Sequence, residues 1–384
     1  TVVTGSRFTS QLASLLAATT CIANPTLENT EIPDMPIAPE KDLDPGLFSL
    51  SRTLNFHLEL TDKCNAGCPM CGRTVEMDRC RPNFEKVRNI ELSLDVIRRN
   101  FPPDFCRRVD TIDLCGGLGD PPAARECLEI CQYFIDNGIK LILSSNGGLR
   151  SEDWWGKLGD IFSSNSSFVE FHIDGLADTN HLYRINTRFS KIMANARAFL
   201  DTGANGEWHF IPFKHNQHQL AEALSLSRKM GFRSFQVIDT IRFGPSKSFV
   251  YQMPDGSIRH LEPSSGDIVS LASGKNAPQQ VTKAVDSQAT QPISCKSANE
   301  NRPYIVADGS VSACCWVEGS DDEKHMYSRA KLGHEEHNIN RRLLQEILLE
   351  EPYRRIYPQA WEEGCNPVCI RKCGLMRRNT RTEL

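Results

Sequence analysis

The chain has 384 residues, of which 40% are hydrophobic and 24% are charged, and its formal net charge is -4. This composition is typical of a globular protein with one large domain or two. The mild negative charge gives no attraction to nucleic acid or to an anionic membrane surface, and no apolar run is long enough to span a bilayer. Neither a nucleic-acid partner nor a membrane is therefore expected.

Residues 1 to 50 predict a short helix followed by an extended arm. Phe8, Leu12, Leu15 and Leu16 recur at helical spacing, and five prolines follow between positions 25 and 45. A single basic residue lies near the apolar stretch, which favours an amphipathic helix over a signal peptide. The segment lacks the length and the pattern of an independent domain.

A regular alternation of strands and helices follows. The segment TLNFHLEL at 53–60 alternates apolar and polar residues, which predicts a strand. Alternating strands and helices indicate a parallel sheet with right-handed crossovers. About six such units fit a partial or complete barrel, and an open doubly wound sheet is the alternative. Further strands are predicted at 109–115, 139–145, 168–173, 207–213 and 234–239, with helices at 93–101, 121–138, 151–162, 188–202 and 218–231.

The alternation stops near residue 240. Asp255-Gly256 is a hairpin signal, and the polar Ser-, Gln- and Ala-rich stretch behind it predicts a linker or a mobile lid. Further on, YIVADGSVSACC at 304–315 predicts a hairpin that turns at Asp308-Gly309. The predicted parts are an N-terminal arm (1–50), a barrel (51–240), a hairpin with linker or lid (241–294) and a small C-terminal α+β domain (295–384).

The chain contains fifteen cysteines, and most of them are clustered. Three lie at 64–71 and six lie between 295 and 373. A secreted protein held together by disulfides is normally short and loop-rich, which this chain is not. The clustering therefore favours thiolates gathered around metal. Such thiolates must stay reduced, which predicts a cytoplasmic protein.

The first cluster comprises Cys64, Cys68 and Cys71, on a loop that directly follows the first predicted strand. Short spacings let neighbouring thiols reach adjacent corners of a metal cluster. A cubane [4Fe-4S] cluster takes four cysteines, one for each iron, so three cysteines leave one iron open. A zinc site with a fourth ligand from Cys80 or His57 is the alternative.

The spacing C-x3-C-x2-C on this loop resembles the signature of the radical S-adenosylmethionine (SAM) enzymes. The resemblance implies that Cys64, Cys68 and Cys71 hold the catalytic [4Fe-4S] cluster and that SAM chelates its open iron through amino and carboxylate groups. An electron from the cluster then cleaves SAM to a 5'-deoxyadenosyl radical, which abstracts a hydrogen from substrate. The family usually has an aromatic residue before the third cysteine. Here that residue is Met70, which is large and soft enough to pack against an adenine.

Three further stretches follow predicted strands, at the edge where parallel sheets bind ligands. CGGLGDPP resembles the family's Gly-rich loop that receives the SAM amino group, with Asp in place of the usual Glu, and a plain turn is the alternative. SSNGG lies where related enzymes contact the ribose or carboxylate of SAM. HIDGLADTNHLYR resembles a segment that is common in related enzymes. For the polar residues of both stretches, the ordinary polarity of a strand end is an equally good explanation. The SAM-binding residues that the resemblance implies are Met70, Gly116, Gly117, Asp120, Ser145, Asn146, Asp174 and Arg184.

The C-terminal cysteines form the second cluster. Two of them flank the predicted hairpin, an arrangement that resembles the first half of SPASM/Twitch modules, which hold one or two auxiliary Fe-S clusters. Residues 332–357 resemble the linking helix of these modules, but the full pattern ends with other spacings. We predict one auxiliary [4Fe-4S] cluster, with two clusters or a structural zinc module as alternatives. The ligands are expected among Cys295, Cys314, Cys365, Cys369 and Cys373, with Cys315 as a spare neighbour.

The remaining cysteines favour ordinary roles. Cys127 and Cys131 lie four residues apart on a predicted helix, hence on one face and in the core. Cys115 abuts the Gly-rich loop, and core packing is favoured over a role as a hydrogen donor or acceptor. The basic tail RKCGLMRRNTRTEL is predicted to be a solvated end.

The predicted fold class is α/β, a partial (βα)6 radical SAM barrel with a small C-terminal iron-sulfur domain. The resemblance implies an enzyme that modifies a ribosomally synthesised peptide by crosslinking, epimerisation or excision. A dehydrogenase or epimerase of a sugar or small metabolite is the second hypothesis, and a non-catalytic zinc- or cluster-binding scaffold is the third. The implied partners are the peptide or small-molecule substrate and an external electron donor such as flavodoxin or ferredoxin. A separate leader-recognition protein is a further expectation, because residues 1–50 are too short for such a domain.

Overall fold

The structure is a computed structural model that describes part of the chain. All described residues belong to one unit, which spans residues 44–384. The predictions for the N-terminal helix, for the stretch at 267–292, for Cys80 and for Cys365 lie outside the described residues. The described residues are 46–74, 87–240, 242–243, 248–266, 293–318, 320, 323–324, 334–362, 367–369, 372–373 and 380–383.

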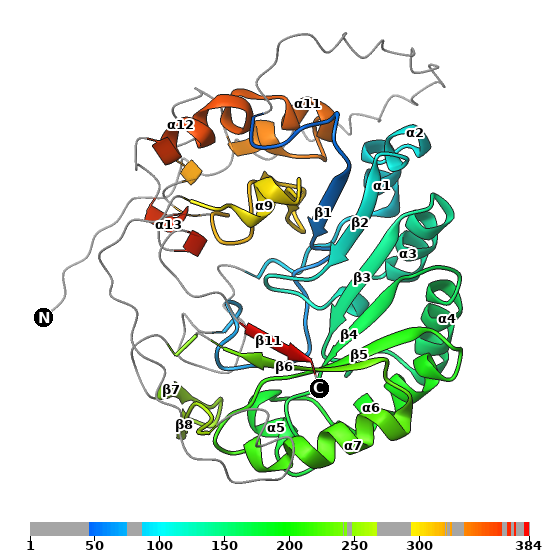
Figure 1. Ribbon diagram of the computed structural model, residues 1–384, viewed down its shortest axis with the longest axis vertical. Coiled ribbons are helices and arrows are strands. Elements are labelled where there is room, and N and C mark those ends of the chain that lie inside the picture. The colour runs from blue at the N-terminus through cyan, green and yellow to red at the C-terminus, as the bar shows by residue number, and fades with distance from the viewer. Residues whose placement is uncertain are drawn as a thin grey trace, which may run out of the picture. The chain divides into compact units, whose positions relative to one another are not determined.

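The main sheet has the strand order β10-β9-β1-β2-β3-β4-β5-β6-β11. Strands β1 to β6 are parallel and follow the chain order, which confirms the α/β class and the six predicted strands. The order does not reverse, as it would in a doubly wound sheet, and the strands fan round as in a partial barrel (Figure 1). The strands are β1 (Leu54–Leu58), β2 (Val109–Leu114), β3 (Lys140–Ser145), β4 (Phe168–His172), β5 (Asn205–Phe210), β6 (Ser234–Asp239), β7 (Phe249–Gln252), β8 (Ile258–Leu261), β9 (Tyr304–Ile305), β10 (Val311–Ser312) and β11 (Thr380–Glu383).

Helices cover the outer face of the sheet (Figure 1). Two of them begin after a serine whose hydroxyl accepts a backbone hydrogen bond at 3.3 Å, Ser93 before α1 and Ser151 before α4. The helix predicted from residue 121 begins only at Cys127, because the prolines form a separate 3-10 turn, Pro121–Ala123. The helices are α1 (Leu94–Asn100), α2 (Pro103–Cys106), α3 (Cys127–Asp136), α4 (Glu152–Phe162), α5 (Asn180–Tyr183), α6 (Phe189–Leu200), α7 (Leu220–Met230), α9 (Lys296–Asn299), α11 (Leu344–Leu348), α12 (Tyr357–Glu362) and α13 (Pro367–Cys369).

The two faces of the sheet differ in chemistry because strand side chains alternate between them. The outer face is apolar: Phe56, Trp155 and Phe171 are fully buried, and the rings of the last two lie 5.1 Å apart. The opposite face carries polar groups such as His57 and His172, which line a cavity. The functional site is therefore to be found on the inner face.

The chain after residue 293 continues the barrel sheet. β9 pairs with β1 in parallel and with β10 antiparallel, which confirms the hairpin predicted at Asp308-Gly309. The amide of Glu59, just past the end of β1, donates a hydrogen bond to the carbonyl of Ile305 at 2.9 Å. Apolar side chains of α11 join the same hydrophobic core as the barrel. The C-terminal residues are thus built onto the edge of the sheet.

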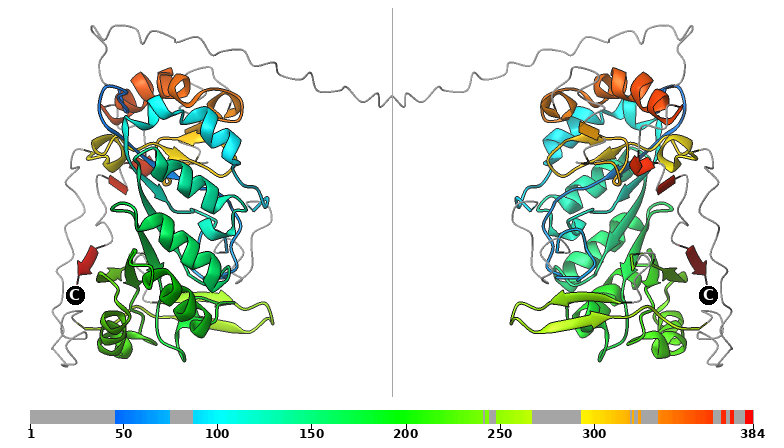
Figure 2. Two further views of the ribbon diagram at one scale, coloured as in Figure 1. Left: turned by 90° about the vertical axis from the view of Figure 1, so that its right-hand side faces the viewer. Right: turned by 90° about the vertical axis from the view of Figure 1, so that its left-hand side faces the viewer.

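Three further predictions meet different outcomes. The hairpin at Asp255-Gly256 is confirmed as β7 and β8, a separate pair beside the main sheet (Figure 2). The single linking helix predicted at 332–357 is replaced by a 3-10 turn, α11 and further short helical segments. Within the basic tail, the described residues Thr380–Glu383 form β11, which pairs antiparallel with β6, and Glu383 is exposed. None of the helices in the described part of the chain combines the length and the apolar character of a membrane span.

Candidate cofactor site

One cavity of about 580 Å³ lies on the inner face of the sheet. Its wall includes the ends of several barrel strands, the loop after β1 and residues that follow position 293. Both groups of cysteines predicted to bind metal therefore face the same space. The cysteines that line this cavity are Cys64, Cys68, Cys71, Cys115, Cys295, Cys314, Cys315 and Cys373.

The first three of these, Cys64, Cys68 and Cys71, are called the cysteine triad below. Their loop is fixed by its own backbone and by its neighbours. The amide of Gly67 donates to the carbonyl of Ile185 at 2.9 Å, and the amide of Cys71 donates to the carbonyl of Cys68 at 3.1 Å. Three thiols on one anchored loop are thereby presented to the cavity from a single side.

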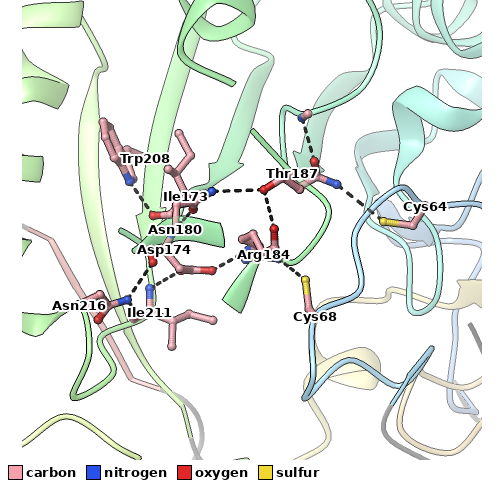
Figure 3. Close-up of polar contacts among 12 residues, drawn as sticks. Cys64, Cys68, Ile173, Asp174, Asn180, Arg184, Thr187, Trp208, Ile211 and Asn216 are labelled. Atoms are coloured by element: carbon pink, nitrogen blue, oxygen red, sulfur yellow. Dashed lines mark hydrogen bonds and ion pairs between the residues drawn. The ribbon is translucent and has the colours of Figure 1, made fainter. Parts of the chain in front are cut away.

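A guanidinium lies beside the second thiol of the triad. Nη1 of Arg184 is 3.7 Å from Sγ of Cys68, and Nε of the same arginine donates to Oδ2 of Asp174 at 2.6 Å (Figure 3). Asp174 is fully buried, and its other oxygen accepts from the amide of Ile211 at 2.6 Å. Burial raises the pKa of Cys68 to about 11, and Arg184 opposes that rise. Arg184 lines the cavity, whereas Asp174 lies behind it and holds the arginine in place.

A buried carboxylate lies beside the first thiol. Nδ2 of Asn146 is 3.7 Å from Sγ of Cys64 and donates to Oδ2 of Asp120 at 2.8 Å. Asp120 is only 3% exposed, and burial raises its pKa to about 6, against hydrogen bonds from Ser145 and Asn146. All three polar residues line the cavity. The structure thus brings Asp120, Ser145 and Asn146 together next to the triad.

The Gly-rich loop after β2 is pressed against the cysteine loop. A Cβ atom on Gly119 would lie 1.7 Å from the carbonyl oxygen of Thr61, so only glycine fits there. Gly116 and Gly117 line the cavity, as does Gly119. The sequence pattern CGGLGD is therefore explained by close packing of two backbones.

Glu59 is a buried carboxylate next to the site that the sequence analysis did not single out. One carboxylate oxygen accepts from the amides of Leu118 and Gly119 at 2.7 and 3.1 Å, and the other accepts from the hydroxyl of Tyr304 at 3.0 Å. Burial raises the pKa of this carboxyl above its ordinary value. Glu59 ties the Gly-rich loop to the C-terminal residues. The sequence feature that could have identified Glu59 is a carboxylate at the end of an otherwise apolar strand that leads into the cysteine loop.

Met70 does not line the cavity. Its buried side chain belongs to a small apolar cluster with Ala66, Tyr183 and Phe213, and its carbonyl accepts from Nη1 of Arg242 at 2.7 Å. The predicted contact between Met70 and an adenine remains a prediction. The described contacts of Met70 help to hold the cysteine loop in place.

Four of the predicted auxiliary ligands come together near the end of the chain. The thiols of Cys295 and Cys373 are hydrogen-bonded to each other, and this bond and burial raise the pKa of Cys295. Burial and the neighbouring Cys315 and Cys369 raise the pKa of Cys314 to about 12. We call Cys295, Cys314, Cys369 and Cys373 the C-terminal cysteine group. Cys369 is buried and is not among the residues that line the cavity.

The other cysteines divide between core and cavity. Cys127 and Cys131 are fully buried in α3, as predicted. Cys115 lines the cavity, so the expectation of core packing is wrong for this residue. Nε2 of His57 lies 2.7 Å from the carbonyl oxygen of Cys115, and burial lowers the pKa of this imidazole to about 4. His57 thus engages a carbonyl instead of serving the triad as a fourth ligand.

The charged side chains that line the cavity suit a metal cluster bound by thiolates. Basic side chains outnumber the one carboxylate, that of Asp120, among the described residues that line the cavity. Positive charge nearby stabilises thiolates, which are the ligands of iron-sulfur clusters. The basic side chains are Arg184, Arg242, Lys296, Arg302 and Lys372.

No protein-family model matches the sequence, and no curated protein matches it. Among solved structures, the chain is similar to Streptococcus suis SuiB bound to S-adenosylmethionine, with 13% identity and a TM-score of 0.46 over 71% of this chain and 62% of SuiB. It is also similar to anSMEcpe with bound AdoMet, with 14% identity and a TM-score of 0.48 over 79% of each chain. SuiB bound to the precursor peptide SuiA gives 12% identity and a TM-score of 0.45 over 70% of this chain and 62% of SuiB. The chain spans less than two thirds of the length of SuiB.

Proposed function

We propose that this chain is a radical SAM enzyme. The observation that carries the proposal is the shared cavity: the cysteine triad lines it from one loop, with Asp120 and Arg184 beside two of the three thiols. A triad with polar partners of both charges suits a cluster with one open iron and a zwitterionic ligand on it. When bound, that cluster supplies the electron that cleaves the sulfonium of SAM.

The residues around the triad have separate roles in this proposal. The carboxylate of Asp120 would accept a hydrogen bond from the amino group of SAM, and Ser145 and Asn146 hold that carboxylate. The guanidinium of Arg184, fixed by Asp174, donates to the carboxylate of SAM. Glycines 116 and 117 let the loop backbone approach the ligand.

The C-terminal cysteine group has four thiols, which suffices for one closed auxiliary cluster. The hydrogen bond between Cys295 and Cys373, and the electrostatic effect of Cys369 on the pKa of Cys314, support a common site for these residues. Three of the four also line the cavity of the triad. An auxiliary cluster held by these thiols would supply a second redox group at the wall of the same cavity.

A peptide is the substrate that the sequence resemblance favours. SuiB and anSMEcpe have been solved with peptides bound, SuiA and Cp18Cys among them. Lys296, Arg302 and Lys372 line the cavity beside the C-terminal cysteines, which favours acidic groups on whatever enters. An electron donor such as flavodoxin or ferredoxin belongs to the same proposal.

The test is SAM cleavage by the full chain. The protein is reconstituted anaerobically with iron and sulfide, reduced with dithionite so that no protein donor is needed, and given SAM. The proposal expects 5'-deoxyadenosine to form. If zinc fills the cysteine sites and no 5'-deoxyadenosine appears, the chain is a metal-binding scaffold and not an enzyme of this class.

A further inference from the structure

A second set of potential ligands lies on the inner face of the sheet and includes no cysteine, although Glu170 is a neighbour of Cys115. Glu170 and His172 are two residues apart on β4, so their side chains project from the same face. The neighbouring strand β5 pairs His209 with His172 in register. Two imidazoles and a carboxylate therefore meet on two adjacent parallel strands.

The ligand atoms of the three residues all lie within 4.8 Å of one another. Nε2 of His209 is 3.7 Å from Oε1 of Glu170, and Nε2 of His172 is 3.7 Å from Oε2 of the same carboxylate. These separations are too long for hydrogen bonds. They suit atoms that share one ion, because metal-ligand bonds of about 2.0–2.2 Å hold neighbouring ligands more than 3 Å apart.

We propose that Glu170, His172 and His209 bind one divalent transition-metal ion, with zinc as the reference ion. Two histidines and one glutamate are a donor set that zinc and iron(II) accept, and it leaves further positions for water or a ligand. The site does not depend on the proposed radical function, because it uses none of the cysteines.

Neighbouring contacts support this site. The hydroxyl of Ser144 donates to Oε2 of Glu170 at 2.7 Å, which fixes the orientation of the carboxylate. Nε2 of His209 is hydrogen-bonded to Oε2 of Glu207 at 3.0 Å, and Glu207 is paired with Arg233, so an ion at this nitrogen would replace that hydrogen bond. His209 is fully buried, and its Nδ1 has no hydrogen-bond partner among the described residues.

The position of the three residues indicates how an ion would be reached and what it would do. His172 and Ser144 line the same cavity as the cysteine triad, whereas His209 does not line it and is fully buried. An ion held here has its remaining positions toward the cavity. It would bind a carboxylate, carbonyl or hydroxyl oxygen of a molecule in that space, and so position this molecule against the barrel wall.

The experiment measures zinc on the full, cluster-loaded chain under anaerobic conditions. Zinc is titrated in competition with a chromogenic chelator, and zinc X-ray absorption gives the bond lengths. The proposal expects one zinc per chain with nitrogen and oxygen ligands at about 2.0–2.1 Å, not sulfur at about 2.3 Å. His172→Ala and Glu170→Gln should each weaken binding by about 100-fold or more, since even outer contacts to a metal ligand change affinity by 10–100-fold.

The matched control is His260→Ala, an exposed histidine on the separate β7–β8 pair, which should bind zinc as the natural chain does. Glu170→Gln keeps the shape of the side chain, so a loss of zinc there is not explained by misfolding. The variant Cys64→Ala/Cys68→Ala/Cys71→Ala should keep this zinc. Zinc bound only through sulfur, or equal affinity in His172→Ala and His260→Ala, would overturn the proposal.

Discussion

The cysteine triad and three of the four thiols of the C-terminal cysteine group line one cavity, but the two sites are built in opposite ways. The triad comes from one short loop, and its thiols have polar partners, Asn146 on Cys64 and Arg184 on Cys68. The C-terminal group comes from separate segments near α9, β10 and the chain end; its Cys295 and Cys373 are hydrogen-bonded to each other, and Cys314 and Cys369 are electrostatic neighbours. The difference indicates a first site that stays open to a polar ligand and a second that closes on itself.

The largest effect is expected from removing the triad. Cys64→Ala/Cys68→Ala/Cys71→Ala should lose about four irons, the content of one cubane, together with all SAM cleavage. The C-terminal cluster should remain, because its thiols come from other segments. Iron and sulfide analysis and 5'-deoxyadenosine detection measure both.

The control for the triad variant is Cys127→Ala, whose thiol lies in the core of α3. It should keep its iron content and its SAM cleavage. If the triad variant loses all its iron while the control keeps its own, the two sites are not independent and the comparison fails.

Removing thiols of the C-terminal cysteine group should lower the iron content but leave SAM cleavage intact. Cys295→Ala/Cys373→Ala should also lose about four irons, yet still cleave SAM with dithionite as reductant. The melting temperature should fall further than in the triad variant, because this cluster joins segments distant in sequence. If this variant folds but no longer cleaves SAM, the claim that the triad cluster cleaves SAM without the C-terminal cluster is contradicted.

A smaller effect is expected at Asp120. Asp120→Asn removes a charge-assisted hydrogen bond from the amino group of SAM, worth about 1.5–3 kcal/mol, or roughly a 10- to 100-fold loss of affinity. The pKa of about 6 sets the pH dependence: the carboxylate is ionised above it and protonated below it. SAM binding by the natural chain should therefore weaken as the pH falls through 6.

Isothermal titration with SAM from pH 5 to 8 measures this effect. Asp120→Asn should show a flat profile, and Asp153→Asn, at an exposed position on α4, should behave as the natural chain. Equal affinities for the natural chain and Asp120→Asn at neutral pH would remove Asp120 from the SAM site.

The smallest effect concerns the packing of the two loops. Gly119→Ala would place a Cβ atom against the carbonyl of Thr61 and should lower the free energy of unfolding by about 1–3 kcal/mol. At Gly156 in α4, a Cβ atom would make only an ordinary contact with the carbonyl oxygen of Ala198 at 4.0 Å, so Gly156→Ala should raise stability by about 0.5–1 kcal/mol. Urea unfolding of the metal-free chains compares the two. Equal stabilities would mean that the loops do not pack as described.

Much of this architecture was accessible from the sequence because it is local. Alternating patterns predicted β1 to β6, and the three closely spaced cysteines predicted one ligand loop. The pairing of β9 with β1 and of β11 with β6 was not accessible, since it joins residues far apart in the chain. For the same reason the sequence did not reveal that Cys115 faces the cavity or that Glu59 links two loops through Tyr304.

The cluster at Glu170, His172 and His209 was equally hidden. Its members are spread over two strands, and each alone is an ordinary polar residue in a strand. Only the register of β4 and β5 brings them together. Short ligand spacings on one loop can be predicted from sequence, whereas ligands contributed by neighbouring strands need the sheet topology.

The central claim is that one open and one closed cluster share the cavity. Electron paramagnetic resonance of the reduced, reconstituted chain, with and without SAM and alongside iron analysis, tests it most directly. The claim predicts about eight irons per chain and two signals, of which SAM changes only the one that the triad variant lacks. Zinc in place of iron, or a spectrum that SAM leaves unchanged, would contradict it.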